Sequence, residues 1–174
     1  MLLKKLCCIL CCIAILCLTA ATGFAAGWFD GADRNGSIFF DFNTDQISVE
    51  GGSFELRMVA YWDDESKSLQ WCEGWEGCGL SLDEDGLFED DAAAAALLAY
   101  AEANNIPANT MEVASNGTAR IVEVPLGLFL FSQSTPFEGC LPLLPYLISV
   151  PVEGEDGWIF DVEAMPKLEP LIPE

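Results

Sequence analysis

The segment that decides the fold is residues 53–62, which read Ser53-Phe54-Glu55-Leu56-Arg57-Met58-Val59-Ala60-Tyr61-Trp62. Apolar residues stand at every second position from Phe54 to Ala60, and the positions between them begin with Glu55 and Arg57. Because successive side chains of a β-strand point to opposite faces, this alternation predicts a strand with one buried face. We expect the apolar set from Phe54 to Ala60 to share that face.

Other strands are predicted on both sides of this segment. Runs rich in β-branched and aromatic residues, bounded by Gly, Pro and Asn turn signals, mark their positions. They lie at residues 36–42, 69–72, 118–124, 128–133, 145–150 and 158–164. The run at 69–72 follows a charged turn and predicts a hairpin with 53–62, and the run at 158–164 alternates in the same way as the first.

A single helix is predicted between the strands, at residues 89–104. Its acidic start, Glu89-Asp90-Asp91, suits the positive end of a helix dipole, and an Ala-rich run of high helix propensity follows. Pro107 limits it at the other end, and its large apolar groups are expected to lie across a sheet. Short strands with one inserted helix predict a mainly β fold, an antiparallel β-sandwich. We expect one domain at 36–168, followed by a Pro-rich tail at 169–174.

The first residues, 1–25, have the composition of a secretory signal peptide. Lys4 and Lys5 precede an apolar run from Leu6 to Leu18, and small residues follow up to Ala25, where cleavage is expected. The run is shorter than the ~20 residues that span a bilayer, so we expect cleavage and no stable membrane insertion afterwards. The mature protein is therefore expected to be secreted and extracellular, or held at the cell surface.

Composition excludes several classes of function. The 174-residue chain is acidic, with 28 acidic and 7 basic residues and a formal net charge of -21, which disfavours binding to nucleic acid phosphates. It contains no histidine, which removes Ser-His-Asp and Cys-His catalytic units and His-ligated metals. Carboxylate pairs are abundant, but so many acids produce pairs by chance. We predict a protein that is not an enzyme and has no metal site or cofactor.

Most of the cysteines lie in the expected signal peptide. Of the eight in the chain, only Cys72, Cys78 and Cys140 follow it. Outside the cell these three can form one disulfide and leave one thiol. The sequence leaves all three pairings open: a bond from Cys72 to Cys78 would close a small loop, whereas a bond to Cys140 would join distant segments.

Several short motifs carry more weight in their order and spacing than they do singly. They are Gly36-Ser37-Ile38, Gly52-Ser53-Phe54-Glu55-Leu56, a helix ending in Ala99-Tyr100-Ala101, Gly117, Pro125-Leu126-Gly127-Leu128-Phe129-Leu130 and Pro145-Tyr146-Leu147-Ile148-Ser149-Val150-Pro151. Together they resemble the N-terminal domain of the sortase-assembled (LPXTG-type) backbone pilins of Gram-positive bacteria. The resemblance covers residues 36–168 and implies an Ig-like, prealbumin-like fold and a structural or adhesive role at the cell surface.

The most specific match closes this series. Residues 158–167 read Trp158-Ile159-Phe160-Asp161-Val162-Glu163-Ala164-Met165-Pro166-Lys167 and resemble the pilin motif Trp-x-x-x-Val-x-Val-Tyr-Pro-Lys. The matching positions are Trp158, Val162, Pro166 and Lys167, and the differing ones are Ala164 and Met165. In the family, this lysine amine attacks a sortase-bound acyl group and becomes the isopeptide link between subunits. The resemblance therefore implies that Lys167 is the acceptor, with other pilin subunits and a class C sortase as partners.

Two departures from the family pattern qualify this expectation. No Leu-Pro-x-Thr-Gly sorting signal follows Lys167, so this sequence is expected to accept a linkage and not to donate one. Many pilin domains also contain an internal Lys–Asn isopeptide bond, whose lysine would correspond to a position near Phe42. The lysines that follow the signal peptide are Lys67 and Lys167. No internal isopeptide bond is therefore expected.

Ligand binding is the alternative class of function, and it depends on the aromatic residues in the loop at 62–75. Trp62, Trp71 and Trp75 are close together in the sequence. If exposed, they would form a platform for a host or cell-wall ligand, and the chain would be a free secreted binding module. If buried, they belong to the core.

Overall fold

The computed structural model describes residues 34–44, 47, 49, 51–82 and 91–171. These residues belong to one compact unit, Asp33–Glu174. The signal peptide predicted at 1–25 and the first two positions of the predicted helix, 89 and 90, lie outside the described ranges. Within those ranges, no helix has the length and apolar character needed to cross a bilayer.

The strands form two main sheets, as the alternating and β-branched runs predict. The three-stranded sheet has the order β10-β1-β5 and contains β1 (Gly36–Asp41), β5 (Thr118–Val124) and β10 (Asp161–Ala164). The five-stranded sheet contains β2 (Ser53–Asp63), β3 (Ser68–Trp71), β4 (Asn109–Glu112), β6 (Gly127–Thr135) and β7 (Tyr146–Val150). Its order is β3-β2-β6-β7, and β4 pairs with the first half of β2. A separate ribbon joins β8 (Val152–Gly154) to β9 (Gly157–Ile159).

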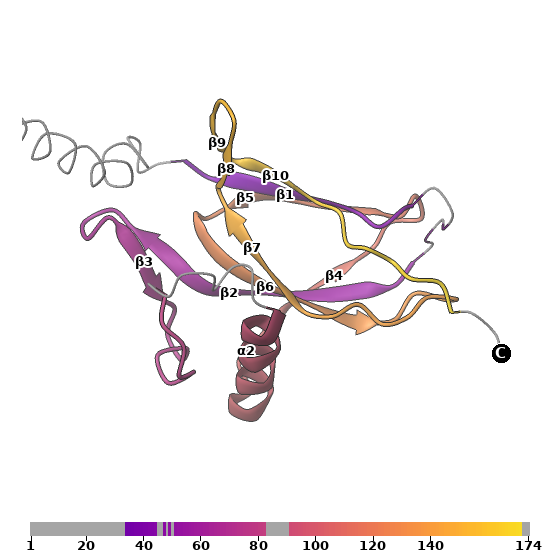
Figure 1. The fold of residues 1–174 in the computed structure, drawn as a ribbon, viewed down its shortest axis with the longest axis horizontal. Coiled ribbons are helices and arrows are strands. Elements are labelled where there is room, and N and C mark those ends of the chain that lie inside the picture. Colours follow the sequence, from indigo (N-terminus) through magenta and orange to yellow (C-terminus); the bar gives the residue numbers. More distant parts are fainter. Residues whose placement is uncertain (1–33, 45–46, 48, 50, 83–90, 172–174) are drawn as a thin grey trace, which may run out of the picture. The chain divides into compact units, whose positions relative to one another are not determined.

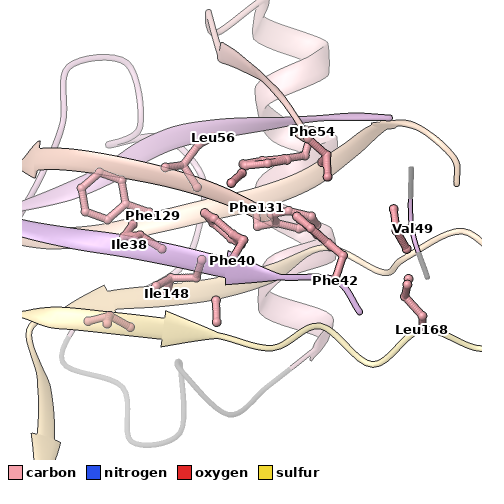
Figure 2. Close-up of a cluster of buried hydrophobic side chains, with 14 of the residues drawn as sticks. Ile38, Phe40, Phe42, Val49, Phe54, Leu56, Phe129, Phe131, Ile148 and Leu168 are labelled. Atoms are coloured by element: carbon pink, nitrogen blue, oxygen red, sulfur yellow. The ribbon is translucent and has the colours of Figure 1, made fainter. Parts of the chain in front are cut away.

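An apolar core fills the space between the two sheets, and we call it the inter-sheet core. Phe40 and Phe42 reach it from β1 and the residue after that strand, and Phe54 and Phe131 reach it from β2 and β6 (Figure 2). All four rings are fully buried. Because residues of both sheets share this core, the structure confirms a mainly β fold built as a sandwich.

Helix α2 (Asp91–Asn104) covers the other face of the five-stranded sheet, away from β1 and β10 (Figure 1). Buried residues of the helix and of the sheet face beneath it form a second cluster, which we call the helix-side core. Its members are Val59, Ala60, Trp75, Ala93, Ala94, Leu97, Ala101, Leu128 and Leu130. The helix ends at Asn104, and the next residue, Asn105, has a φ of 53°, the left-handed conformation that commonly follows a helix. The Ile106 N–H donates to the Ala101 carbonyl at 2.9 Å, and the buried Arg57 donates to the Ile106 carbonyl at 3.3 Å.

Three details differ from the sequence-based expectations. The pair β1–β10 is parallel, whereas the other described pairs are antiparallel. The strand predicted at 158–164 is divided at Phe160 into β9 and β10. At this point the chain leaves the β8–β9 ribbon and joins β1, and the Phe160 carbonyl accepts from the Ser37 N–H at 2.9 Å. The short strands β4 and β8 were not predicted, since four and three residues carry too little periodicity to be recognised.

The prediction that residues 53–62 have a single buried face is wrong at the C-terminal end of this segment. Phe54, Leu56 and Met58 contact the inter-sheet core, but Ala60 belongs to the helix-side core together with Val59. The register between β2 and β6 shifts between Met58 and Ala60, which marks an irregularity of the β-bulge type. A bulge inserts one residue, and every side chain beyond it changes face.

Candidate functional site

Lys167 lies on an exposed segment that follows β10, where the resemblance places the acceptor amine. Its side chain is exposed, and the preceding Met165 is also largely exposed. Among the described residues, the ion pairs join Arg57 to Glu55 and Lys67 to Asp64, and neither involves Lys167. The amine is therefore not held by an acidic partner in the described part of the chain.

Strand β10 fixes the chain on the N-terminal side of Lys167. Val162 and Ala164 are buried and point into the inter-sheet core, and they lie opposite Ile38 and Phe40 in the parallel pairing with β1. At the start of β10 the Ser37 hydroxyl donates to the Asp161 carboxylate at 2.5 Å. The apolar positions of the pilin motif thus act as anchors.

A second anchor follows Lys167 directly. Leu168 is buried in the inter-sheet core, near Phe42 and Val49 (Figure 2). Beyond it, the Leu141 N–H donates to the Glu169 carbonyl and the Leu171 N–H donates to the Gly139 carbonyl, both at 2.8 Å. The described part of the predicted Pro-rich tail therefore pairs with the loop that precedes β7. Sequence reasoning missed this anchor, although an isolated leucine after the motif lysine was its signal.

The remaining motif residues are less closely grouped. Pro166 is half-buried beside Lys167, whereas Trp158 is half-buried in β9, across the break at Phe160. Arg34 lies over the Phe160 ring, 5.3 Å from its centroid, and so contributes a cation–π contact near this break. The structure brings Val162, Pro166 and Lys167 into one continuous segment and leaves Trp158 in the neighbouring ribbon.

The position near Phe42, where the family places its internal crosslinking lysine, is occupied by aromatic rings. Phe42 is fully buried and packs against Phe54 and Phe137, with ring centroids 5.7 and 5.0 Å away. Lys67 lies in the β2–β3 turn with a 58% exposed side chain, 3.4 Å from Asp64. Neither Lys67 nor Lys167 is buried, so neither is placed to form an internal bond.

The intact mass of the purified chain tests this expectation. We expect the mass to match the sequence, after allowance for any disulfide, because both lysines of the described residues, Lys67 and Lys167, are exposed. Loss of one ammonia, with a Lys–Asn crosslink found by peptide mapping, would contradict the prediction.

The three tryptophans do not form one surface platform. Trp75 is 1% exposed and lies in the helix-side core, with its ring centroid 6.1 Å from that of Tyr100. This tryptophan therefore belongs to the core and not to a binding surface. Trp71 is half-buried and packs against the same cluster. Trp62 is half-buried, and its Nε1 donates to the Asp64 carboxylate at 3.2 Å. These contacts assign Trp71 and Trp75 to packing.

The three cysteines are thiols in the structure, and they occupy two different places. Cys140 is buried in the inter-sheet core, whereas Cys72 and Cys78 are half-buried against the helix-side core. Burial raises the pKa of the Cys72 thiol, and the nearby Glu76 carboxylate adds to the effect. This thiol therefore remains protonated to a higher pH than an ordinary cysteine.

Searches with protein-family models and among curated proteins find no match to this chain. Solved structures do match. The full-length major pilin SpaD from Corynebacterium diphtheriae is similar over 82% of this chain and 32% of that protein, with a TM-score of 0.49 and 20% identity. The solution structure of the SpaA pilin–signal peptide complex from the same organism matches over 80% of this chain and 100% of that one, with a TM-score of 0.46 and 20% identity.

A third match extends the comparison to another organism. The pilus 2b backbone protein of group B streptococcus is similar over 79% of this chain and 42% of that protein, with a TM-score of 0.43 and 13% identity. This chain therefore spans less than half of the length of SpaD and of the streptococcal protein. The matching structures are Gram-positive backbone pilins, the family that the sequence motifs resemble.

Proposed function

We propose that this chain is a structural domain of a pilus or pilus-like assembly on a Gram-positive cell surface, and that Lys167 is its acceptor amine. The observation that carries the proposal is the placement of Lys167. Its exposed side chain follows buried Ala164 by three residues and directly precedes buried Leu168. A side chain held between two anchors, without an acidic partner among the described residues, is suited to enter the cleft of a modifying enzyme.

The anchors reduce the entropy that is lost when the lysine enters that cleft. Fixing the backbone of one residue costs about 1–2 kcal/mol, and this cost is already met where β10 and the Glu169–Leu171 pairing hold the chain. Pro166 adds to the effect, since its ring fixes φ at about −65°. The part of the chain that the enzyme must still order is therefore mainly the Lys167 side chain.

The chemistry is acyl transfer from the sortase to the lysine. A base of the sortase removes one proton from the Lys167 ammonium group, and the free amine attacks the carbonyl carbon of the enzyme-bound acyl group. The bond between that carbon and the enzyme nucleophile breaks, the nitrogen gives up its second proton to the departing nucleophile, and an amide forms at Lys167. This chain supplies the nucleophile and its position, and the sortase supplies the base, so the chain itself is not an enzyme.

A transfer assay tests the proposal. The full chain is incubated with a class C pilus sortase and a fluorescent sorting-signal peptide, and the products are mapped by peptide mass spectrometry. We expect one adduct at Lys167. A Lys167→Arg variant, which keeps the charge but removes the primary amine, should reduce the adduct to background, and Lys67→Arg is the matched control that should leave it unchanged.

Two results would overturn the proposal. One is an adduct that persists in Lys167→Arg and maps to Lys67. The other is no adduct on the wild-type chain with a sortase encoded beside its gene, while the same enzyme modifies the lysine of its own shaft subunit.

A further inference from the structure

The structure distinguishes among the three possible disulfides, because the five-stranded sheet lies between the cysteines. Cys140 contacts the inter-sheet core on one face of this sheet, and Cys72 and Cys78 contact the helix-side core on the other. The Cα atoms of a disulfide lie roughly 4.4–6.8 Å apart. A bond from Cys140 to either of the other two would have to pass through a packed sheet, which excludes two pairings.

The remaining pairing joins the two ends of one short loop, Cys72 and Cys78. The Trp75 N–H donates to the Cys72 carbonyl at 3.1 Å, and the Cys78 N–H donates to the Trp75 carbonyl at 3.0 Å. Two successive turns therefore bend the chain around the buried Trp75, and each turn keeps the Cα atom of its cysteine within about 7 Å of the Trp75 Cα atom.

We propose that Cys72 and Cys78 form the disulfide of the exported chain and that Cys140 remains a thiol. Each of the two thiols gives up one proton and one electron as the S–S bond forms. A disulfide donor takes up these two electrons and two protons and becomes two thiols; outside the cytoplasm this donor is an oxidised dithiol protein or a small-molecule disulfide.

The bond would hold the loop at 72–78 against helix α2. Trp75 packs beside Tyr100, and a Cβ added at Gly77 would lie 2.8 Å from the Tyr100 hydroxyl, so the loop and the helix are in close contact. A crosslink across the base of this loop restricts its open conformations. This inference does not depend on Lys167 or on a sortase, and its test is separate from the transfer assay.

Peptide mapping tests the pairing directly. The full chain is oxidised with oxidised glutathione, denatured, blocked with N-ethylmaleimide and cleaved by a glutamate-specific protease. Glu73 and Glu76 lie between the two cysteines, so cleavage separates Cys72 from Cys78 unless a disulfide joins them. We expect a disulfide-linked pair of peptides containing Cys72 and Cys78, with N-ethylmaleimide on Cys140.

Two results of the peptide mapping would overturn the inference. One is N-ethylmaleimide or glutathione on Cys72 and Cys78, and the other is a disulfide from either of them to another cysteine. Thermal unfolding gives a second measurement. A seven-residue loop predicts that reduction lowers the Tm of the oxidised chain by roughly 5–8 °C. Cys72→Ser should show no dependence on the reductant, and an equal Tm for the oxidised and reduced wild type would contradict the proposal.

Discussion

A Gly127→Ala variant is expected to lose about 3–5 kcal/mol of the free energy of unfolding, through backbone strain and overpacking. Gly127 begins β6 with a φ of 157°, in the region that favours glycine. A Cβ at this position would lie 2.2 Å from the Ala60 carbonyl oxygen and 2.9 Å from the Met58 terminal carbon. The closer of these atoms is backbone of the neighbouring strand, which cannot move without disturbing the β2–β6 register.

Domains of this kind are stable by about 5–15 kcal/mol, so such a loss removes a large part of the total. Urea and thermal denaturation measure it, and each kcal/mol corresponds to a Tm shift of about 2–4 °C. Gly139→Ala is the matched control, since Gly139 has a φ of 74° but no atom within 4 Å of an added Cβ. It should cost only the strain of the left-handed conformation, about 1–2 kcal/mol. Equal losses for the two variants would show that the close approach to Ala60 has no effect.

The same glycine shows how far sequence reasoning extends. The Pro125-Leu126-Gly127 run predicts a tight break before a strand, and β6 does begin at Gly127. The reason why only glycine fits there is the carbonyl of Ala60, a contact between strands that are distant in sequence. Local patterns reveal turns and strand faces, but they do not reveal which backbones meet.

The candidate site likewise combines features that the local sequence predicts with contacts between distant segments that it does not predict. Exposure of Lys167 and burial of Val162 agree with the alternation of the motif, because the spacing of alternate residues is local information. The pairing of Glu169 and Leu171 with the 139–141 loop depends on hydrogen bonds between segments that β7 to β10 separate in the sequence, and no short motif marks it. Trp71 and Trp75 face the helix because of the hairpin register and the loop turns, which the sequence leaves open.

A Phe131→Ala variant is expected to lose close to 5 kcal/mol, the upper end of the range for buried phenylalanine. Phe131 is fully buried in β6 and lies at the centre of the aromatic residues of the inter-sheet core. Its ring centroid is 4.6 Å from Tyr146, 5.1 Å from Phe54 and 5.7 Å from Phe40. Removing this ring leaves a cavity that rings from both sheets line, and neither sheet can move to fill it without breaking its own pairing.

Phe137→Ala and Phe131→Leu separate the contributions to this loss. Phe137 is buried, but Phe42 is its ring partner among the described aromatic pairs, so its truncation should cost nearer 3 kcal/mol. Phe131→Leu retains most of the apolar volume and should cost about 1–2 kcal/mol, because the ring contacts are lost while the cavity remains partly filled. Chemical denaturation gives all three values on one scale. In the family that the motifs resemble, an internal crosslink would lie near Phe42, whereas here the described residues of the two sheets meet through the apolar inter-sheet core. If Phe131→Ala unfolded no more easily than Phe137→Ala, these central rings would not be the contact that holds the two sheets together.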